Sequence, residues 1–143
     1  MADLKPVEAA LAALLEGVQP LGSERLPCDR AAGRILAEPV AASLDVPPFD
    51  NSAMDGYALN HKDAGRWLRV SQRIAAGATG EPLERGTCAR IFTGGAIPAG
   101  ADCVVMQESV EIDGDRVGVP AGIPAGDNIR RRGRDVAAGS ELL

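Results

Sequence analysis

The chain has 143 residues, of which 45% are hydrophobic and 24% are charged, and its formal net charge is −5. This composition is typical of a globular protein with one modest domain or two small ones. An acidic chain lacks the basic face on which general nucleic-acid binding depends. No apolar run approaches the ~20 residues of a membrane-spanning helix, so we expect neither nucleic acid nor a membrane as a partner.

The first predicted element is a helix near the N-terminus. Asp3 and Pro6 suit the cap and the first turn of a helix, and Gly17 and Pro20 predict its end. The apolar residues between them recur at helical spacing on one face, which we expect to be buried: Val7, Leu11, Leu14, Leu15 and Val18.

A second, shorter helix is predicted over residues 29–35, before Pro39 stops it. Its apolar residues, which we expect to pack inward, are Ala31, Ala32 and Ile35.

From residue 41 onward the sequence predicts short β-strands. Strands are expected over residues 67–74, 88–92 and 103–106, and a hairpin with a glycine turn joins residues 110–112 to 117–119. Seventeen glycines and ten prolines predict many turns. We therefore expect a mainly β fold with N-terminal helices. It combines an irregular coiled sheet, or small barrel-like domain, with a small helical segment.

The cysteines indicate a structural role and a reducing compartment. Cys28, Cys88 and Cys103 are far apart, form no CxxC pair, and share the chain with one histidine, His61. This pattern argues against a Cys/His zinc site. We expect each cysteine to be buried. Their odd number, with no signal-peptide pattern, predicts a cytoplasmic protein.

The first candidate site is the segment VPPFDNSAMDGYAL, residues 46–59. Pro47 and Pro48 stiffen the chain, and Gly56 permits either a positive φ or a close backbone approach. Asp55, with Asp50 and Ser52, is placed to face a ligand or a metal-bound phosphate. The alternative is that residues 50–52 only satisfy the backbone of a turn.

The second candidate site is FTGGAIP, residues 92–98. The Thr93 hydroxyl and the backbone N–H groups of Gly94 and Gly95 are suited to cradling an anion. No Gly-Lys-Ser/Thr follows, so the segment is not a P-loop. A tight turn at the end of a strand is the alternative.

The third candidate site is NIRRRGRD, residues 128–135, with four arginines in an acidic chain. Arginine presents planar donors to phosphate or carboxylate. The segment is therefore suited to anion binding or to a subunit interface. The alternative is a solvated run that pairs with some of the twenty acidic residues.

In this order and spacing, the three segments resemble the N-terminal region of the MoeA family, the molybdopterin molybdenumtransferases, to which the E domain of gephyrin is similar. Residues 46–59 are similar to the family's hallmark, and RIFTGGAIPAGADCVVMQE, residues 90–108, to its second signature. DNIRRRGRDVAAGSELL, residues 127–143, is similar to its third. Arg134 departs from the pattern, because an acidic residue is expected before Asp135.

The resemblance implies an elongated chain of four domains, of which this sequence holds only the first two. Domain one would comprise residues 1–44 with 128–143, and domain two residues 45–127. A Rossmann-like pterin-binding domain and a small β-barrel would lie beyond Leu143. On this interpretation the sequence is a fragment that is inactive alone.

The resemblance also implies an activity in molybdenum cofactor biosynthesis. Family members insert molybdate into adenylylated molybdopterin and release AMP, with Mg²⁺ assisting, and they act as homodimers. Their site lies between domain two of one subunit and the pterin-binding domain of the other.

Transferred to this chain, the family pattern makes Asp55 and Thr93 catalytic residues and makes Asp55 also the metal ligand. The ligand-binding residues would be Ser52, Gly94, Arg130, Arg132 and Asp135. A gephyrin-like scaffold without catalysis is the alternative. Convergence of Asp55, Thr93 and Asp135 on a concave face would favour the enzyme.

Overall fold

The computed structural model describes residues 4–19 and 21–143. The chain divides into two compact units, Met1–Pro39 and Val40–Leu143, each of which is considered by itself. Within the described residues, no helix combines the length and the apolar character that a membrane span requires.

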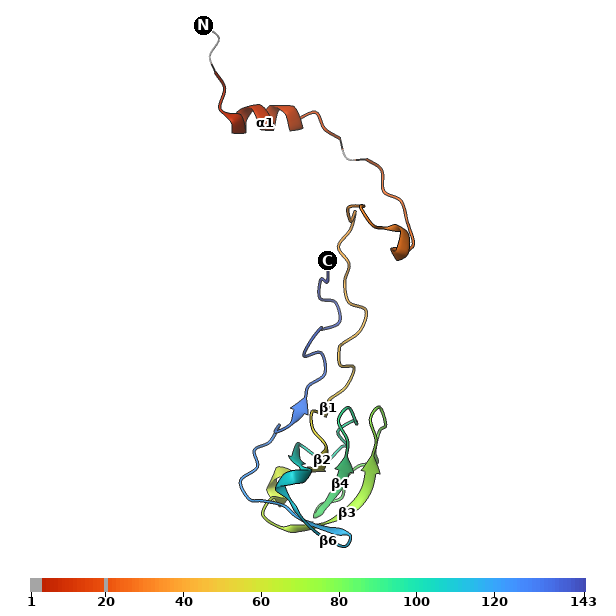
Figure 1. The fold of residues 1–143 in the computed structure, drawn as a ribbon, viewed down its shortest axis with the longest axis vertical. Coiled ribbons are helices and arrows are strands. Elements are labelled where there is room, and N and C mark those ends of the chain that lie inside the picture. The colour runs from red at the N-terminus through yellow and green to blue at the C-terminus, as the bar shows by residue number, and fades with distance from the viewer. Residues whose placement is uncertain (1–3, 20) are drawn as a thin grey trace. The chain divides into compact units, whose positions relative to one another are not determined.

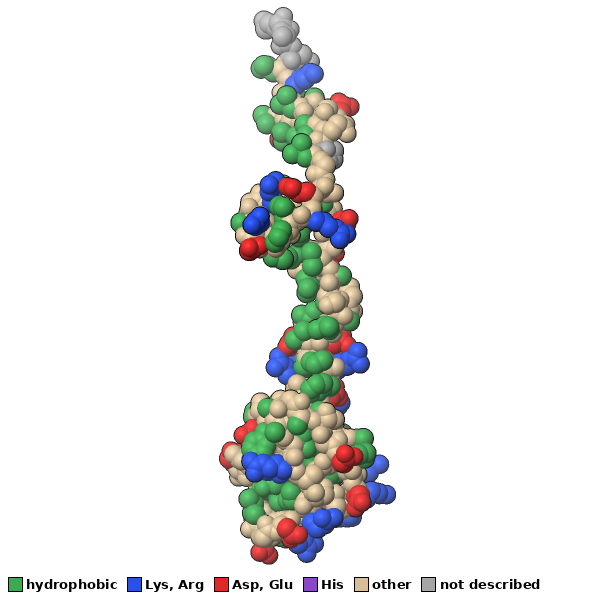
Figure 2. All heavy atoms as spheres, turned by 90° about the vertical axis from the view of Figure 1, so that its right-hand side faces the viewer, with side chains coloured by type: hydrophobic (Ala, Val, Ile, Leu, Met, Phe, Trp, Pro, Cys, Tyr) green, Lys and Arg blue, Asp and Glu red, His purple; other side chains and the backbone are tan. Residues whose placement is uncertain are grey.

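The N-terminal unit contains helix α1 (Val7–Leu15) and the 3₁₀ turn η1 (Cys28–Arg30). The first predicted helix is confirmed over Val7–Leu15, and it follows directly on Pro6. Asp3 and Pro20 lie outside the described residues. No residue of α1 is buried, which contradicts the buried face that we expected, and hydrophobic side chains lie on the surface of this unit in Figure 2.

The second predicted helix, over residues 29–35, is wrong. Only η1 forms there, and the three residues expected to pack inward are all exposed, Ile35 at 96%. Gly33 has a φ of +78°, which is incompatible with a right-handed helix at that position. Cys28 is also exposed, so the expectation of a buried thiol is wrong there.

The second unit is built on a six-stranded sheet in the order β5-β2-β4-β3-β7-β6 (Figure 1). Its strands are β2 (Gly56–Leu59), β3 (Trp67–Ile74), β4 (Thr87–Ile91), β5 (Cys103–Met106), β6 (Glu111–Asp113) and β7 (Arg116–Gly118). Neighbours are antiparallel except β3 and β4, which are parallel. The strands expected from the sequence are confirmed as β3, β4, β5 and the β6–β7 hairpin, whereas β2 was not predicted.

Four smaller elements belong to the same unit. Strand β1 (Asn51–Ser52) pairs with β8 (Ile129–Arg130) in a separate two-stranded ladder. The 3₁₀ turns η2 (His61–Asp63) and η3 (Gln107–Ser109) follow β2 and β5. The fold is therefore mainly β, as predicted.

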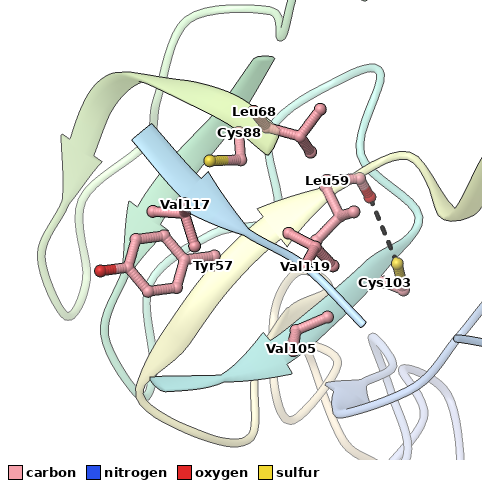
Figure 3. Packing of buried hydrophobic residues seen from close by; sticks show 8 residues of the cluster. All are labelled: Tyr57, Leu59, Leu68, Cys88, Cys103, Val105, Val117 and Val119. Carbon is pink, nitrogen blue, oxygen red and sulfur yellow. Dashed lines mark hydrogen bonds between the residues drawn. The ribbon is translucent and has the colours of Figure 1, made fainter. Parts of the chain in front are cut away.

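The core consists of two apolar clusters, and strands β2, β3, β4 and β5 contribute residues to both. The first contains Tyr57, Leu59, Leu68, Cys88, Cys103, Val105, Val117 and Val119 (Figure 3). The second contains Ala58, Ile74, Ala89, Ile91, Val104 and Ile129. Tyr57 and Leu59 enter the first cluster and Ala58 the second, which explains why these three residues of β2 are all buried.

Cys88 and Cys103 are buried core residues, as predicted. Burial raises the pKa of the Cys88 thiol to about 11 and that of Cys103 to about 12. The Cys103 thiol donates to the Leu59 carbonyl oxygen at 3.5 Å (Figure 3). Neither thiol is ionised at neutral pH, so both are inert structural groups.

Gly56 is required because its backbone passes close to β5. A Cβ atom on this residue would lie 2.0 Å from the Val105 carbonyl oxygen, far inside van der Waals contact. Of the two reasons that the sequence offered for this glycine, the close approach is the correct one. The tight packing fixes where β2 begins, and therefore where Asp55 lies.

The last residues of the chain return to lie beside residues 40–46. Val40 N donates to Leu143 O at 3.1 Å, and Val46 N donates to Val136 O at 2.8 Å. Both segments belong to the compact unit Val40–Leu143. The assignment of residues 1–44 and 128–143 to one domain stays a prediction.

Candidate functional site

Asp55 and Thr93, from the first and second sequence motifs, are in direct contact. Asp55 immediately precedes β2, and Thr93 follows the end of β4 by two residues. The two strands are antiparallel neighbours with Gly56 opposite Ile91, which brings these ends together. Thr93 donates to Asp55 Oδ1 twice, from its backbone N at 2.8 Å and from its Oγ1 at 2.7 Å.

These two hydrogen bonds keep Asp55 ionised. They hold the pKa of its carboxyl below the usual range, first through the Thr93 backbone N–H and then through the hydroxyl; partial burial opposes the shift, and the nearby Arg90 charge adds to it. In the described part of the chain, Asp55 Oδ2 has no hydrogen bond. The site thus offers one anchored oxygen and one that is open to a cation, a water molecule or a ligand.

The backbones of the first two motifs are paired beside this contact. Ser52 N donates to Gly95 O, and Gly94 N donates to Ser52 O, both at 2.9 Å. Ile97 N donates to Asp50 O at 3.0 Å. These backbone hydrogen bonds join the two loops beside the Asp55–Thr93 contact.

The hydroxyl of Ser52 and the backbone N–H of Gly94 are both occupied by hydrogen bonds within these loops. Ser52 is 1% exposed, and its hydroxyl donates to the Met54 carbonyl oxygen at 2.5 Å. The Gly94 N–H is bound to Ser52 O, as described above. Contact of either residue with a ligand stays a prediction, and in the structure both hold the loops together.

The third motif is attached to the first through the β1–β8 ladder, in which Arg130 lies opposite Asn51. Arg130 forms an ion pair with Asp135. Among the described residues, no hydrogen bond or ion pair joins Asp135 to Asp55 or Thr93. Of the three residues expected to converge, the structure brings two into contact.

Two further arginines of the run, Arg131 and Arg132, are bound to acidic residues in or just before the first motif. Arg131 Nη1 lies 2.5 Å from Asp50 Oδ2, and Arg132 Nε lies 2.5 Å from Asp45 Oδ2. The Arg132 backbone N also donates to Asp50 Oδ1 at 2.8 Å. The alternative of pairing with acidic residues is thus what the structure shows for three arginines. Arg134 has no ion pair among the described residues.

These contacts favour ionised carboxylates. The Arg132 backbone N–H, and then Arg131, lower the pKa of Asp50 against an opposing effect of burial. The backbone N–H of Ala138 and then Arg132 lower the pKa of Asp45. The residues 45–50 and 130–138 are therefore fastened together by charged contacts.

Two features of this region were not predicted. Arg90, at the start of the second signature, donates from Nη1 to the Gly56 carbonyl oxygen at 2.8 Å, beside Asp55. His61 Nδ1 lies 2.6 Å from Asp102 Oδ2, and its backbone N donates to Asp102 Oδ1 at 2.7 Å. Each contact joins residues more than thirty positions apart, so local patterns carried no signal for it.

The donor set at Asp55 fits a metal that is shared with a ligand. Within residues 4–19 and 21–143, no three His, Cys, Asp or Glu side chains are grouped closely enough to hold an ion by themselves. Mg²⁺ in phosphate-transfer sites is commonly held by one or two carboxylates together with substrate phosphates and water. One open carboxylate oxygen agrees with that arrangement.

Two surface hollows lie elsewhere on the sheet. One, of about 440 Å³, is lined by residues that include Tyr57, Arg73, Arg90 and Asp115. The other, of about 230 Å³, is lined by residues that include Trp67 and Glu111. Neither is lined by Asp55 or Thr93; Asp55 is half-buried and Thr93 is exposed.

Comparison with known proteins shows one consistent similarity. Residues 5–143 match the family model described as MoeA N-terminal region (domain I and II). The chain is 40% identical to a molybdopterin molybdenumtransferase of Synechococcus elongatus over 94% of this chain and 36% of that protein. It is also 32% identical to gephyrin of Dictyostelium discoideum, over 99% of this chain and 22% of that protein.

A solved structure has the same fold. The molybdopterin biosynthesis moeA protein from Pyrococcus horikoshii superposes with a TM-score of 0.85 at 35% identity, covering 99% of this chain and 40% of that one. The chain spans about a third of the length of the curated transferases that it matches, 36% and 28% for two of them.

Proposed function

Because the chain belongs to the MoeA N-terminal region family, we propose that it supplies one wall of the active site of a molybdopterin molybdenumtransferase. The proposed reaction inserts molybdate into adenylylated molybdopterin and releases AMP. The observation that carries the proposal is the Asp55–Thr93 contact, which joins two family signatures that lie 38 positions apart. A protein of the length of its relatives would supply the opposite, pterin-binding wall.

In this proposal Asp55 and Thr93 have different tasks. Asp55 stays ionised and presents its open oxygen to the adenylyl phosphates, either through Mg²⁺ or by orienting a water molecule. Thr93 holds the other oxygen, so that the carboxylate cannot rotate. When bound, Mg²⁺ would neutralise charge on the phosphates, and Asp55 is the residue of this chain that would hold it.

The third motif has a less direct place in the proposal. Arg130, Arg132 and Asp135 would lie at the edge of the site and keep its loops in place. Their ion pairs support this role, because the guanidinium groups of Arg130 and Arg132 are already bound to carboxylates. Exchange of such a carboxylate for a substrate phosphate is chemically reasonable, since arginine binds both in the same way.

A scaffold without catalysis is the second candidate, and it is favoured by the similarity to gephyrin. A scaffold has no requirement for an ionised carboxylate beside a threonine hydroxyl. The Asp55–Thr93 contact supports the enzyme, whereas Asp135, which was expected to converge with this pair, is bound to Arg130.

One experiment separates the two candidates. A protein that carries this chain at the length of its relatives is incubated with adenylylated molybdopterin, molybdate and Mg²⁺, and AMP is measured by chromatography. We expect molybdate-dependent AMP release. No release from a folded protein would favour the scaffold. We expect no release from the 143-residue chain alone, and turnover by that chain would contradict a divided site.

We also propose that the protein acts in the cytoplasm as a homodimer. The exposed apolar residues of α1 support self-association: Val7 at 77%, Leu11 at 54% and Leu14 at 75%. Three cysteines without a disulfide in the described residues agree with a reducing compartment.

A further inference from the structure

We infer that Arg90 is a positioning residue, which holds the backbone next to Asp55 and Thr93 so that these two side chains stay in contact. This inference rests on the proposed function and goes beyond it, because Arg90 lies in a signature without an assigned role. Arg90 Nη1 donates to the Gly56 carbonyl oxygen at 2.8 Å and to the Ile91 carbonyl oxygen at 2.9 Å. One guanidinium nitrogen therefore bridges the residue after Asp55 and the residue two before Thr93.

Gln107 extends this bridge to the backbone of Asp55 itself. Arg90 Nη2 donates to Gln107 Oε1 at 2.5 Å, and Gln107 N donates to the Asp55 carbonyl oxygen at 3.1 Å. Asp55 is thus held at its carboxylate by Thr93 and at its carbonyl by Gln107, while Arg90 binds the next carbonyl. Strands β2 and β4 and the turn η3 therefore meet at this one guanidinium group.

Aromatic rings hold the Arg90 guanidinium in place. Its carbon lies 4.3 Å from the centroid of the Phe92 ring and 5.4 Å from that of the Tyr57 ring. A lysine would retain the charge and three N–H donors, but its donors lie on one nitrogen and cannot occupy the positions of both Nη1 and Nη2. The geometry therefore requires arginine and not only a positive charge.

Arg73 is a matched control within the same sheet. It lies opposite Arg90 in the β3–β4 ladder, and its guanidinium carbon lies 4.6 Å from the centroid of the same Phe92 ring. Its side chain makes no hydrogen bond to any described residue. Substitution of Arg73 therefore removes a similar charge and a similar aromatic contact, but no hydrogen bond to the site.

The first test uses amide hydrogen exchange in the 143-residue chain. The Thr93 and Gln107 amides report on the contacts to Asp55. We expect Arg90→Gln and Arg90→Lys to speed their exchange about tenfold, the effect of losing one hydrogen bond. Arg73→Gln should change both by less than about twofold. Wild-type exchange in both Arg90 variants, or an equal effect of Arg73→Gln, would overturn the inference.

The second test asks whether Arg90 acts through Asp55 in the longer protein. We expect Arg90→Gln to lower kcat about 10-fold to 100-fold with little change in KM, because geometry and not binding is lost. In an Asp55→Asn background, Arg90→Gln should add less than about a twofold loss. An equal loss in both backgrounds would show that Arg90 does not act through Asp55.

The two tests separate this inference from the proposed function. If the wild-type protein releases no AMP, the proposed function fails, while hydrogen exchange still decides whether Arg90 positions Asp55. If Arg90→Gln does not fold, Arg90→Lys, which retains the charge, is compared with wild type in the same two tests. Full turnover by Arg90→Lys would contradict the requirement for the hydrogen bonds.

Discussion

At the scale of single residues, Asp55 is distinguished by the unequal surroundings of its two carboxylate oxygens. Oδ1 accepts two hydrogen bonds from Thr93, while Oδ2 accepts none from the described residues. Oδ2 is therefore available to water, a cation or a ligand, which is the property that the proposed function uses.

Asp55→Asn should abolish most turnover without unfolding the protein. The amide retains an oxygen to accept from Thr93 but removes the negative charge, so we expect a loss of about 100-fold or more in AMP release. Release of AMP and the melting temperature would be measured together. Asp113→Asn, which removes an exposed carboxylate on β6, is the control for the change in net charge. Normal turnover by a folded Asp55→Asn protein would remove Asp55 from the mechanism.

Asp50 should make the stability of the chain sensitive to acid. Its pKa is lowered in the folded state by the Arg132 backbone N–H and by Arg131, whereas in the unfolded chain it is about 3.9. A carboxyl with a lowered folded pKa contributes stability above the unfolded pKa, and that contribution is lost as pH falls through the folded pKa. We therefore expect the melting temperature to fall below about pH 4.

The Asp50→Asn variant tests this assignment. It should melt at a lower temperature than wild type at pH 7, and the two proteins should approach one another as the pH falls below 4. Asp113→Asn, which alters the net charge by the same amount, should follow the wild-type curve. A constant difference between Asp50→Asn and wild type at every pH would mean that ionisation of Asp50 does not stabilise the fold.

At the scale of elements, the sequence predicted those strands whose own residues form an apolar pattern typical of a strand. Cys103–Met106 is a compact apolar run, and it forms β5 with the expected bounds. The segment over residues 29–35 has helical composition, but its residues are exposed and Gly33 has a positive φ, and it forms only a short turn. Strand β2 was missed because Asp55 and Gly56 indicate a turn locally. There the packing against Val105 overrides the local preference.

The sequence predicted which residues belong to the candidate site, but it did not predict that they contact one another. Asp55 and Thr93 were selected separately, and nothing in their spacing showed that they would meet. Their contact depends on β2 and β4 being neighbours, which is a property of the sheet order. The pairing of Asp45 and Asp50 with arginines more than eighty positions later is likewise set by the returning chain.

The packing of β2 against β5 can be tested by substituting Gly56. Gly56→Ala would place a methyl group where the Val105 carbonyl oxygen lies, so β2 would have to separate from β5. We expect a loss of about 3 kcal/mol or more, which corresponds to a drop of about 10 °C or more in melting temperature. Gly22→Ala, at a position with no atom near the added methyl, should melt within about 2 °C of wild type.

At the scale of the whole molecule, helix α1 requires a stabilising contact outside the helix itself. Its nine residues are too few for a stable isolated helix in water. Its apolar side chains remain exposed within the unit that contains them. Such a helix is stabilised when its apolar face packs against another surface, and a second copy of the chain offers the same face.

Self-association of the chain should therefore depend on this face. We expect light scattering to give an apparent mass that rises with concentration from 14.8 kDa toward twice that value, because each copy buries the helix of the other. Leu14→Glu places a charge on a side chain that is 75% exposed and should hold the chain at one copy. Glu16→Lys, just beyond the helix, changes charge without removing apolar area and should associate as wild type does. If the wild-type chain stays at one copy at every concentration, α1 does not mediate dimerisation in this chain. The proposed homodimer would then depend on a contact outside these residues.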